Sequence, residues 1–230
     1  MASTVVFLAV FTPPAQTAAP AVIHVDDDAA AGGNGSAQSP YNTLADALAA
    51  ARETSAAVVI NVRPGDYAVG STLVIDRPLA LRGSSVLTRD ASGWATGEVA
   101  AGTETRIRGT ASLGTQPLVL VGRADASVLS DVEVRGFVFQ AASAAAGIEV
   151  LLTRVQDYTV SDNAFRAPAF LGLQSVASSG RVTGNYFSGP GTGAILTGGF
   201  AASPSNVTFS NNRSVANTIG GLLLNGASIN

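Results

Sequence analysis

The stretch VTGNYF at residues 182–187 decides the fold, because its pattern returns along the chain. Related stretches are VRGFVF (134–139), VSDNAF (160–165) and FSNNRS (209–214). Their fourth positions are separated by 26, 22 and 27 residues. A period in the twenties is typical of solenoids, in which each repeat forms one coil.

Each repeat also predicts short strands. Alternating apolar and polar residues precede the fourth position, and a second apolar segment follows it. These second segments are GIEVLL (147–152), FLGLQS (170–175), GAILTG (193–198) and GGLLLNG (220–226). Two or three short strands per repeat, separated by Gly, Ser and Asn, indicate a parallel β-helix.

Coils of such a solenoid stack at about 4.8 Å, so equivalent side chains form ladders. We expect an inward amide ladder and an inward aromatic stack. The amide ladder consists of Asn163, Asn185 and Asn212, and the stack consists of Phe139, Phe165 and Phe187. Phe137 takes the asparagine position in the first repeat, and Ser214 replaces phenylalanine in the last. The ladder should therefore begin at Asn163.

The N-terminal third predicts a strand at 22–25, an Asp- and Gly-rich loop, and a helix in TLADALAAARE. Thr43 and Asp46 resemble a capping box at the start of the helix. Its apolar face is suited to cover the open end of a β-helix. Residues 84–104 lack periodicity and are interpreted as a loop excursion.

The order of these segments, from SPYNTLADALAAA through VINVRPGDY and LALRGS to repeats ending in N-x-F, resembles the pectate-lyase-like superfamily, including chondroitinase-B-like proteins. The resemblance implies an all-β fold: a right-handed, single-stranded parallel β-helix (solenoid) with a short N-terminal capping α-helix. We expect this domain to occupy residues 22–230, after a secretory signal or disordered arm at residues 1–21.

Composition excludes several classes of function. All 13 basic residues are arginine, the net charge is −3, and no run of basic residues occurs. We therefore expect no nucleic-acid binding. Cysteine is absent, which removes thiolate catalysis and cysteine metal sites, and His24 is the single histidine. No apolar stretch reaches the roughly 18–20 residues that span a bilayer.

The two ends of the chain suggest where the protein acts. An apolar run at 5–11 followed by small residues looks like part of a secretory signal, although a basic start is missing. We expect a secreted or cell-surface protein; the alternatives are a frayed apolar arm or a start placed too far downstream. GLLLNGASIN follows a strand with no cap after it. We expect further coils beyond residue 230, or end-to-end self-association.

The resemblance implies a groove on one strand face, where carboxylates hold Ca²⁺ and an Arg or Lys abstracts a proton from an acidic polysaccharide. With Ile148 and Val150 inward, two outward columns are expected on the second segments. They are Glu149, Gly172, Ile195 and Leu223, and Leu151, Gln174, Thr197 and Asn225. One carboxylate and no arginine make no lyase centre. Glu149, Gln174, Thr197 and Asn225 remain candidate substrate contacts.

Other candidates lie in two clusters. Asp26, Asp27 and Asp28 offer hard oxygen ligands for Ca²⁺, or form a solvated loop. The second cluster, around one predicted turn, is Arg154, Asp157, Asp162 and Arg166. It is either a sugar-binding patch or a set of surface ion pairs, which contribute little to stability.

These observations predict an exported β-helix module that binds or helps to process polysaccharide, with no complete catalytic site in this segment. If the protein is an enzyme, it is a polysaccharide lyase or glycoside hydrolase with catalytic coils beyond residue 230. The alternative is a non-catalytic cell-surface or adhesive structural protein, which the nearly uncharged exterior favours.

Overall fold

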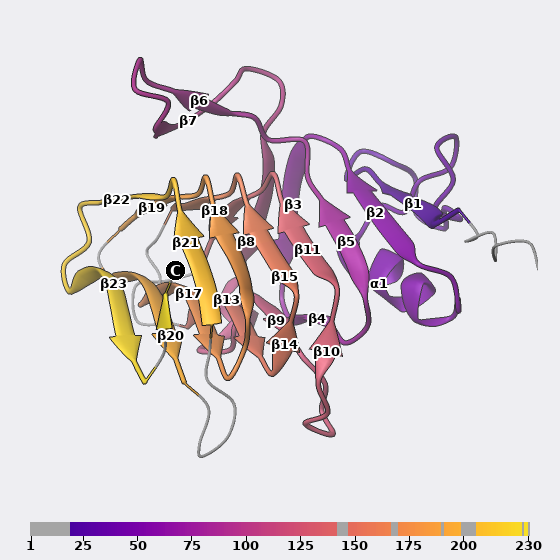
Figure 1. The fold of residues 1–230 in the computed structure, drawn as a ribbon. Helices are drawn as coiled ribbons and strands as arrows, with labels where there is room; N and C mark the ends of the chain where they lie inside the picture. Colours follow the sequence, from indigo (N-terminus) through magenta and orange to yellow (C-terminus); the bar gives the residue numbers. More distant parts are fainter. Residues whose placement is uncertain are drawn as a thin grey trace, which may run out of the picture.

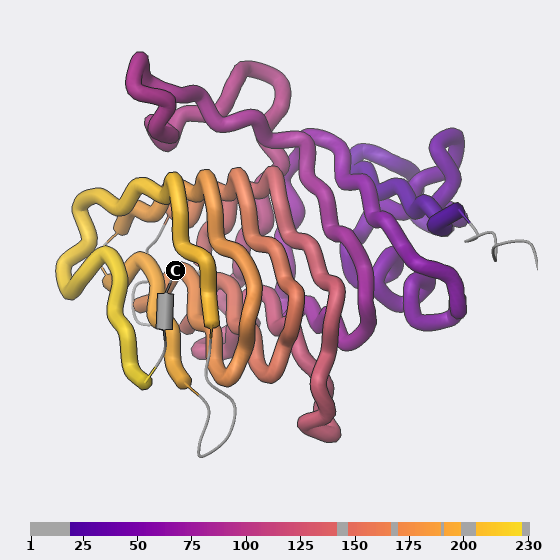
Figure 2. Tube along the Cα trace, in the orientation of Figure 1, coloured from indigo at the N-terminus to yellow at the C-terminus, as the bar shows by residue number. Residues whose placement is uncertain are grey.

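The structure is a computed structural model that describes residues 19–141, 147–166, 170–189, 191–198, 206–226 and 228–229. In these residues the chain winds into a parallel β-helix whose coils stack from the indigo N-terminal end to the yellow C-terminal end (Figures 1 and 2). The predicted fold class is confirmed. Of the predicted signal or arm at 1–21, residues 1–18 lie outside the described part.

Three parallel sheets, named A, B and C in the order in which each coil visits them, form the walls. Sheet A contains β1 (Ala21–Val25), β2 (Val58–Val62), β5 (Leu79–Arg82), β11 (Val132–Arg135), β15 (Tyr158–Ser161), β18 (Gly180–Thr183), β21 (Asn206–Ser210) and β24 (Ser228–Ile229). Sheet B contains β3 (Gly65–Val69), β8 (Thr105–Gly109), β12 (Val138–Gln140), β16 (Ala164–Arg166), β19 (Tyr186–Ser188) and β22 (Arg213–Val215). Sheet C contains β4 (Leu73–Ile75), β9 (Val119–Val121), β13 (Ile148–Thr153), β17 (Leu171–Val176), β20 (Thr192–Thr197) and β23 (Gly220–Asn225). A short pair, β10 (Leu129–Ser130) and β14 (Val155–Gln156), lies before sheet A.

The interior is filled by one layer of side chains from each sheet. In sheet B, the rings of Phe139 and Phe165 stack at 5.2 Å between centroids, and those of Phe165 and Phe187 at 4.6 Å. Ser214 follows in the same register, so the stack ends there. Phe209 from sheet A brings its ring to 6.3 Å from Phe187. Aromatic rings therefore continue the core across the corner between the two sheets.

The turn between sheets A and B holds a ladder of buried amides. Asn163 Nδ2 donates to Asn185 Oδ1 at 3.1 Å, and Asn185 Nδ2 donates to Asn212 Oδ1 at 2.9 Å. Each ladder oxygen also accepts the backbone N–H of the equivalent residue in the previous coil. Asn212 Oδ1 accepts from Asn185, Asn185 Oδ1 from Asn163, and Asn163 Oδ1 from Phe137 at 3.0 Å. Each amide thus satisfies backbone groups that burial would otherwise leave unpaired.

The position before each ladder residue has a left-handed backbone. Gly136, Asp162, Gly184 and Asn211 have φ angles of 73°, 54°, 69° and 54°. Glycine reaches this region freely, and Asp and Asn tolerate it better than other residues. The repeated G-F, D-N, G-N and N-N pairs are therefore one turn used four times.

The helix α1 (Leu44–Arg52) covers the N-terminal end of the stack (Figure 1). Thr43 caps it, because the Asp46 N–H donates to Thr43 Oγ1 at 3.1 Å. The buried face is Leu44, Ala47, Leu48 and Ala51. Among the described residues, no helix is long and apolar enough to cross a membrane.

The segment read as a loop excursion is instead an ordered hairpin. The antiparallel strands β6 (Leu87–Arg89) and β7 (Ala95–Val99) form an arm that leaves the helix between β5 and β8 and extends above the asparagine turns (Figure 1). The sequence did not predict these strands because they have only three and five residues and belong to no repeat. We call residues 83–104 the arm.

Replacement of Asn185 by alanine tests the amide ladder. We expect Asn185→Ala to lower the free energy of unfolding by about 1–3 kcal/mol, because it leaves buried backbone groups unpaired. Denaturant titration measures the change. The outward-facing Asn61→Ala is the matched control and should change stability by less than about 0.5 kcal/mol. Equal stability of both variants would contradict the role of the ladder.

Candidate functional site

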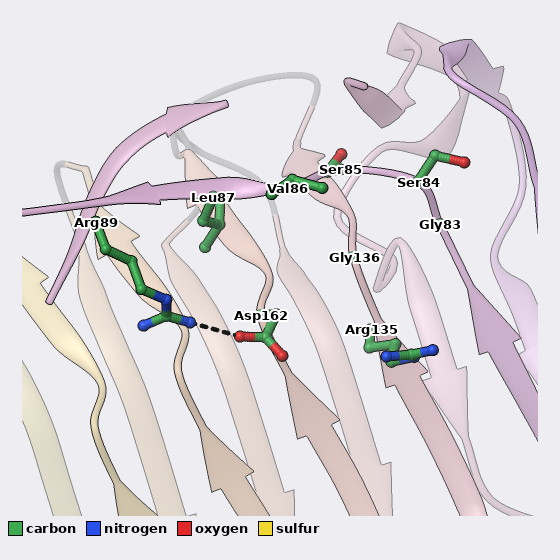
Figure 3. Close-up of a pocket in the computed structure, with 9 residues that line it drawn as sticks. All are labelled: Gly83, Ser84, Ser85, Val86, Leu87, Arg89, Arg135, Gly136 and Asp162. Atoms are coloured by element: carbon green, nitrogen blue, oxygen red, sulfur yellow. Dashed lines mark hydrogen bonds and ion pairs between the residues drawn. The ribbon is translucent and has the colours of Figure 1, made fainter. Parts of the chain in front are cut away.

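A cleft of about 350 Å³ lies between the arm and the edge of sheet A that runs into the asparagine turns. Figure 3 shows the arm segment crossing above the ends of the strands. The lining residues are Gly83, Ser84, Ser85, Val86, Leu87, Arg89, Arg135, Gly136 and Asp162. The cleft is thus built by the arm on one side and by two turns of the solenoid on the other.

The charged residues that line the cleft are Arg89, Arg135 and Asp162, and each has an ion-pair partner. Arg89 Nη2 lies 2.7 Å from Asp162 Oδ1 and ties the arm to the turn (Figure 3). Arg135 Nε lies 2.7 Å from Glu133 Oε1, and Arg82 Nη2 lies 2.8 Å from Glu133 Oε2. One carboxylate therefore serves two guanidinium groups, and one positive charge in this group is not neutralised.

The face of sheet A carries two polar rows that cross the strands, and the first of them includes the cleft residue Arg135. The arginine row is Asn61, Arg82, Arg135, Ser161, Thr183 and Ser210. The second row is Val59, Ala80, Glu133, Thr159, Arg181 and Thr208. Arg181 is exposed, and among the described residues it has no ion-pair partner. Three arginines and one glutamate make these rows locally positive on a chain whose net charge is −3.

The opposite edge of sheet A has a different character. A second hollow of about 350 Å³ has an apolar floor that includes Pro20, Val59, Pro78 and Ala80. Its polar lining residues are Asp131, Glu133, Asp157 and Thr159. The face therefore changes from positive at the arm to acidic at the far edge.

Packing fixes the arm in place. Leu87 and Ala95 are buried against Val138 and Ala164 on the outer face of sheet B. Arg166 Nη2 donates to the carbonyl oxygen of Gly97 at 2.6 Å. A further ion pair joins Arg213 Nη1 to Asp90 Oδ2 at 2.9 Å. These contacts hold the cleft in shape before any ligand enters.

The expected columns on sheet C are wrong in register. Gln174 pairs with Leu151 on one side and Ile195 on the other, and Ile195 pairs with Leu223. Thr197 and Asn225 belong to a separate column that also contains Thr153 and Val176. The reason is that the spacing between coils changes: 23 residues separate Val150 from its partner Leu173, but 21 separate Leu173 from Ala194.

Glu149 does not face solvent, contrary to the expectation. Its side chain is fully buried at the corner between sheets B and C, beside a cavity of about 10 Å³ that Thr192 and Asn217 help to line. The N–H of Ala141 donates to Oε1 at 3.2 Å, whereas Oε2 has no hydrogen-bond partner. Burial raises the pKa of Glu149 well above its usual 4.5. This residue is a buried acid and no surface contact for a ligand.

The predicted sugar patch is divided by the structure. Asp162 lines the arm cleft, and Arg166 lies beneath the arm, with Nη1 3.6 Å from Glu104 Oε2. Arg154 lies at the other edge of the coil, where Nη1 donates to the carbonyl oxygen of Ala126 at 2.8 Å. Asp157 lines the hollow at the far edge. One turn does not hold all four, because strands β15 and β16 separate them.

The predicted calcium ligands do lie together. Carboxylate oxygens of Asp26, Asp27 and Asp28 come within 4.8 Å of one another. Asp26 already pairs with Arg63 at 2.6 Å, and Asp27 Oδ2 accepts the N–H of Asp66 at 2.7 Å. Asp27 Oδ1, by contrast, is buried without a hydrogen-bond partner among the described residues. Calcium binding here stays a prediction.

Sequence reasoning missed the arginines of the sheet A face. Arg82, Arg135 and Arg181 occupy outward positions of the strands that precede the asparagine turn. The alternation in V-E-V-R and G-R-V-T carried this information, because each buried valine fixes its neighbours outward.

The fold defines the class of protein, which is a parallel β-helix with a hairpin arm over one edge. The chain belongs to the family described as "Protein of unknown function (DUF1565)", which matches residues 27–228. No curated protein matches the chain. It is similar to a solved structure named "Rhamnogalacturonan lyase", with a TM-score of 0.24 and 13% identity. That alignment covers 90% of this chain and 62% of the other, so this chain spans less than two thirds of that protein's length.

Burial of Glu149 predicts a pH-dependent stability. Because the folded pKa is raised, stability is fully present below the unfolded pKa near 4.5 and is lost as pH rises through the folded value. Glu149→Gln removes this loss, by about 1.4 kcal/mol for each pKa unit of the shift. Denaturant titrations from about pH 4 to about pH 8 measure the effect. The free energy of unfolding of Glu149→Gln should rise relative to that of the wild type as the pH increases.

The matched control for this prediction is Glu98→Gln, which changes an exposed carboxylate on the arm. Its stability should follow the wild type across the pH range. If the free energy of unfolding of Glu149→Gln has the same pH dependence as that of the wild type, the described burial of Glu149 is wrong.

Proposed function

We propose that this protein is an exported β-helix module that binds polysaccharide across the outer face of sheet A and into the arm cleft. The observation that supports this is the continuity of the cleft with the two polar rows, which together offer guanidinium groups and hydroxyls along several coils. A cleft of about 350 Å³ lies within the usual range for a ligand site, roughly 300–1,000 Å³.

The chemistry of the rows suits a polymer that carries acidic groups. Arginine presents a planar fork of donors that matches carboxylates and sulfates with two parallel hydrogen bonds. The hydroxyls of Thr183 and Ser210, which are partly exposed, can each donate and accept, as sugar hydroxyls also do. A polysaccharide running along the stack would meet these groups at about 4.8 Å intervals.

The described cleft favours binding over bond cleavage. Arg89 and Asp162 are engaged with each other, and arginine does not release a proton near neutral pH. Glu133, which does not line the cleft, is already paired with two arginines. Action as a lyase or glycoside hydrolase would require groups other than those that the described cleft brings together.

Export to the cell surface or the medium is part of the proposal. The apolar run at 5–11 and the small residues after it support a secretory segment. The run itself lies outside the described residues. Cell-fractionation of the tagged protein, with the N-terminus of the mature form sequenced, tests this; an intact cytoplasmic chain would count against it.

A second candidate is a non-catalytic structural or adhesive protein of the cell surface. The observation that favours it is the outer face of sheet C, where aliphatic residues occupy the outward column on five of the six strands. Such a face is typical of protein contacts. Loss of glycan binding combined with retained self-association would favour this candidate.

Alanine substitution at the arginine row tests the proposed binding. We expect Arg135→Ala and Arg181→Ala each to weaken binding to an acidic polysaccharide by about 10- to 100-fold, the effect of losing a hydrogen bond to a charged group. Titration calorimetry with polygalacturonate and chondroitin sulfate, and with neutral dextran as the reference ligand, measures the affinities.

Arg108→Ala is the matched control, because it removes the same charge from the outer face of sheet B. Its binding should equal that of the wild type. Equal weakening by all three variants would indicate a nonspecific charge effect, and no binding of either acidic glycan by the intact protein would overturn the proposal.

A further inference from the structure

The arm cleft is closed at the end where the arm leaves the solenoid, at residues 83–85, which we call the arm root. The N–H of Gly83 donates to the carbonyl oxygen of Arg135 at 2.8 Å, and the N–H of Ser85 donates to that of Gly136 at 2.9 Å. The two backbones touch, since a Cβ atom on Gly83 would lie 2.2 Å from the Gly136 oxygen. A sugar chain has no room to pass between segments that are joined in this way.

The opposite end of the cleft is closed by an ion pair. Arg89 Nη2 lies 2.7 Å from Asp162 Oδ1, and Arg89 Nη1 also donates to the carbonyl oxygen of Gly93 at 3.1 Å. The next turn lies directly behind this pair, because a Cβ atom on Gly184 would come within 2.7 Å of Asp162 Oδ1 and 3.2 Å of Arg89 Nη2. Figure 3 shows the ion pair and the arm root at opposite ends of the cleft.

The back of the cleft is closed by packing. Leu87 lines the cleft and is buried against Val138 and Ala164 on the outer face of sheet B. The remaining side is open and leads past the exposed Arg135 to the outer face of sheet A. Among the described residues, the cleft is therefore a pocket with one opening, whereas a groove that holds the middle of a polymer needs two.

We propose that this pocket holds the terminal uronic acid residue of an acidic polysaccharide, with the rest of the chain leaving over the outer face of sheet A. The inference rests on the function proposed above and adds which part of the polymer is recognised. A volume of about 350 Å³ is near the lower end of the range for ligand pockets, roughly 300–1,000 Å³. It suits the end of a chain better than a long segment.

The opening carries the groups that a uronic acid would meet. The side chain of Arg135 is 48% exposed, and its partner Glu133 is shared with Arg82. One carboxylate thus serves two guanidinium groups, so a carboxylate of the ligand at Arg135 would balance the remaining charge. Val86, which lines the cleft and is 56% exposed, offers an apolar surface to the carbon-bound face of the sugar ring.

Counting the protein molecules bound to each glycan chain tests the proposal. We expect one protein for each chain in oligogalacturonates of defined length, whether short or long, because each chain has one end of the matching polarity. Titration calorimetry measures this ratio. Partial hydrolysis of polygalacturonate supplies a test without a mutation: the amount of protein bound by a fixed mass of glycan should rise in proportion to the number of chain ends.

Removal of the ion pair should open the pocket at one end. Asp162→Gly suits this purpose, because the backbone at Asp162 has a φ of 54° and Gly184 takes the equivalent position in the next coil. We expect this variant to bind long chains at a ratio above one that increases with chain length. Asp157→Gly is the matched control, since Asp157 has the same φ of 54° but lies at the far edge of sheet A. It should keep the wild-type ratio, and circular dichroism melting verifies that both variants are folded.

The outcomes distinguish this inference from the proposed function. If the wild type binds acidic glycans in proportion to chain mass, whatever the number of ends, the chain-end inference is overturned and the proposed function stands. If neither short nor long chains bind, both are overturned. A ratio of one protein for each long chain with Asp162→Gly as well would contradict the closing role assigned to the ion pair.

Discussion

The vertical alignment of equivalent residues is the constraint on which the rest of this structure depends. Each coil of a solenoid has too little interior to be stable alone, so it must share hydrogen bonds and side-chain packing with its neighbours. Asn163, Asn185 and Asn212 show how this is done, because one amide serves its own turn and the backbone of the coil before it. The phenylalanine stack applies the same rule to the core.

The alignment also explains which parts of the fold the sequence could predict. Asn and Phe recur in the sequence because the amide ladder requires Asn at one position of each coil and the aromatic stack requires Phe at another. Sheet C was harder, since paired residues of neighbouring strands are separated by between 21 and 46 residues in the sequence, and turns absorb the difference. Glu149 was misread because strict alternation fails at the corner, where Glu149 and Val150 are both buried.

The candidate site was largely beyond sequence analysis, because it joins segments that are distant in the chain. Arg89 meets Asp162 across 73 residues, and Asp90 meets Arg213 across 123. Neither pair has a local signal, and the arm itself follows no repeat. Arg135 and Arg181 were readable as outward residues, but the cleft beside them exists only once the arm is folded back over the turns.

The left-handed turn has a consequence for how proteins of this design diversify. Asp162 occupies a backbone position that favours Gly, Asn and Asp, and it also lines the cleft. Its identity is therefore restricted by the geometry of the solenoid, whatever the cleft holds. The arm obeys no such restriction. New specificities can accumulate in a single inserted hairpin while the stacked frame stays unchanged, much as antibody loops vary on a constant scaffold.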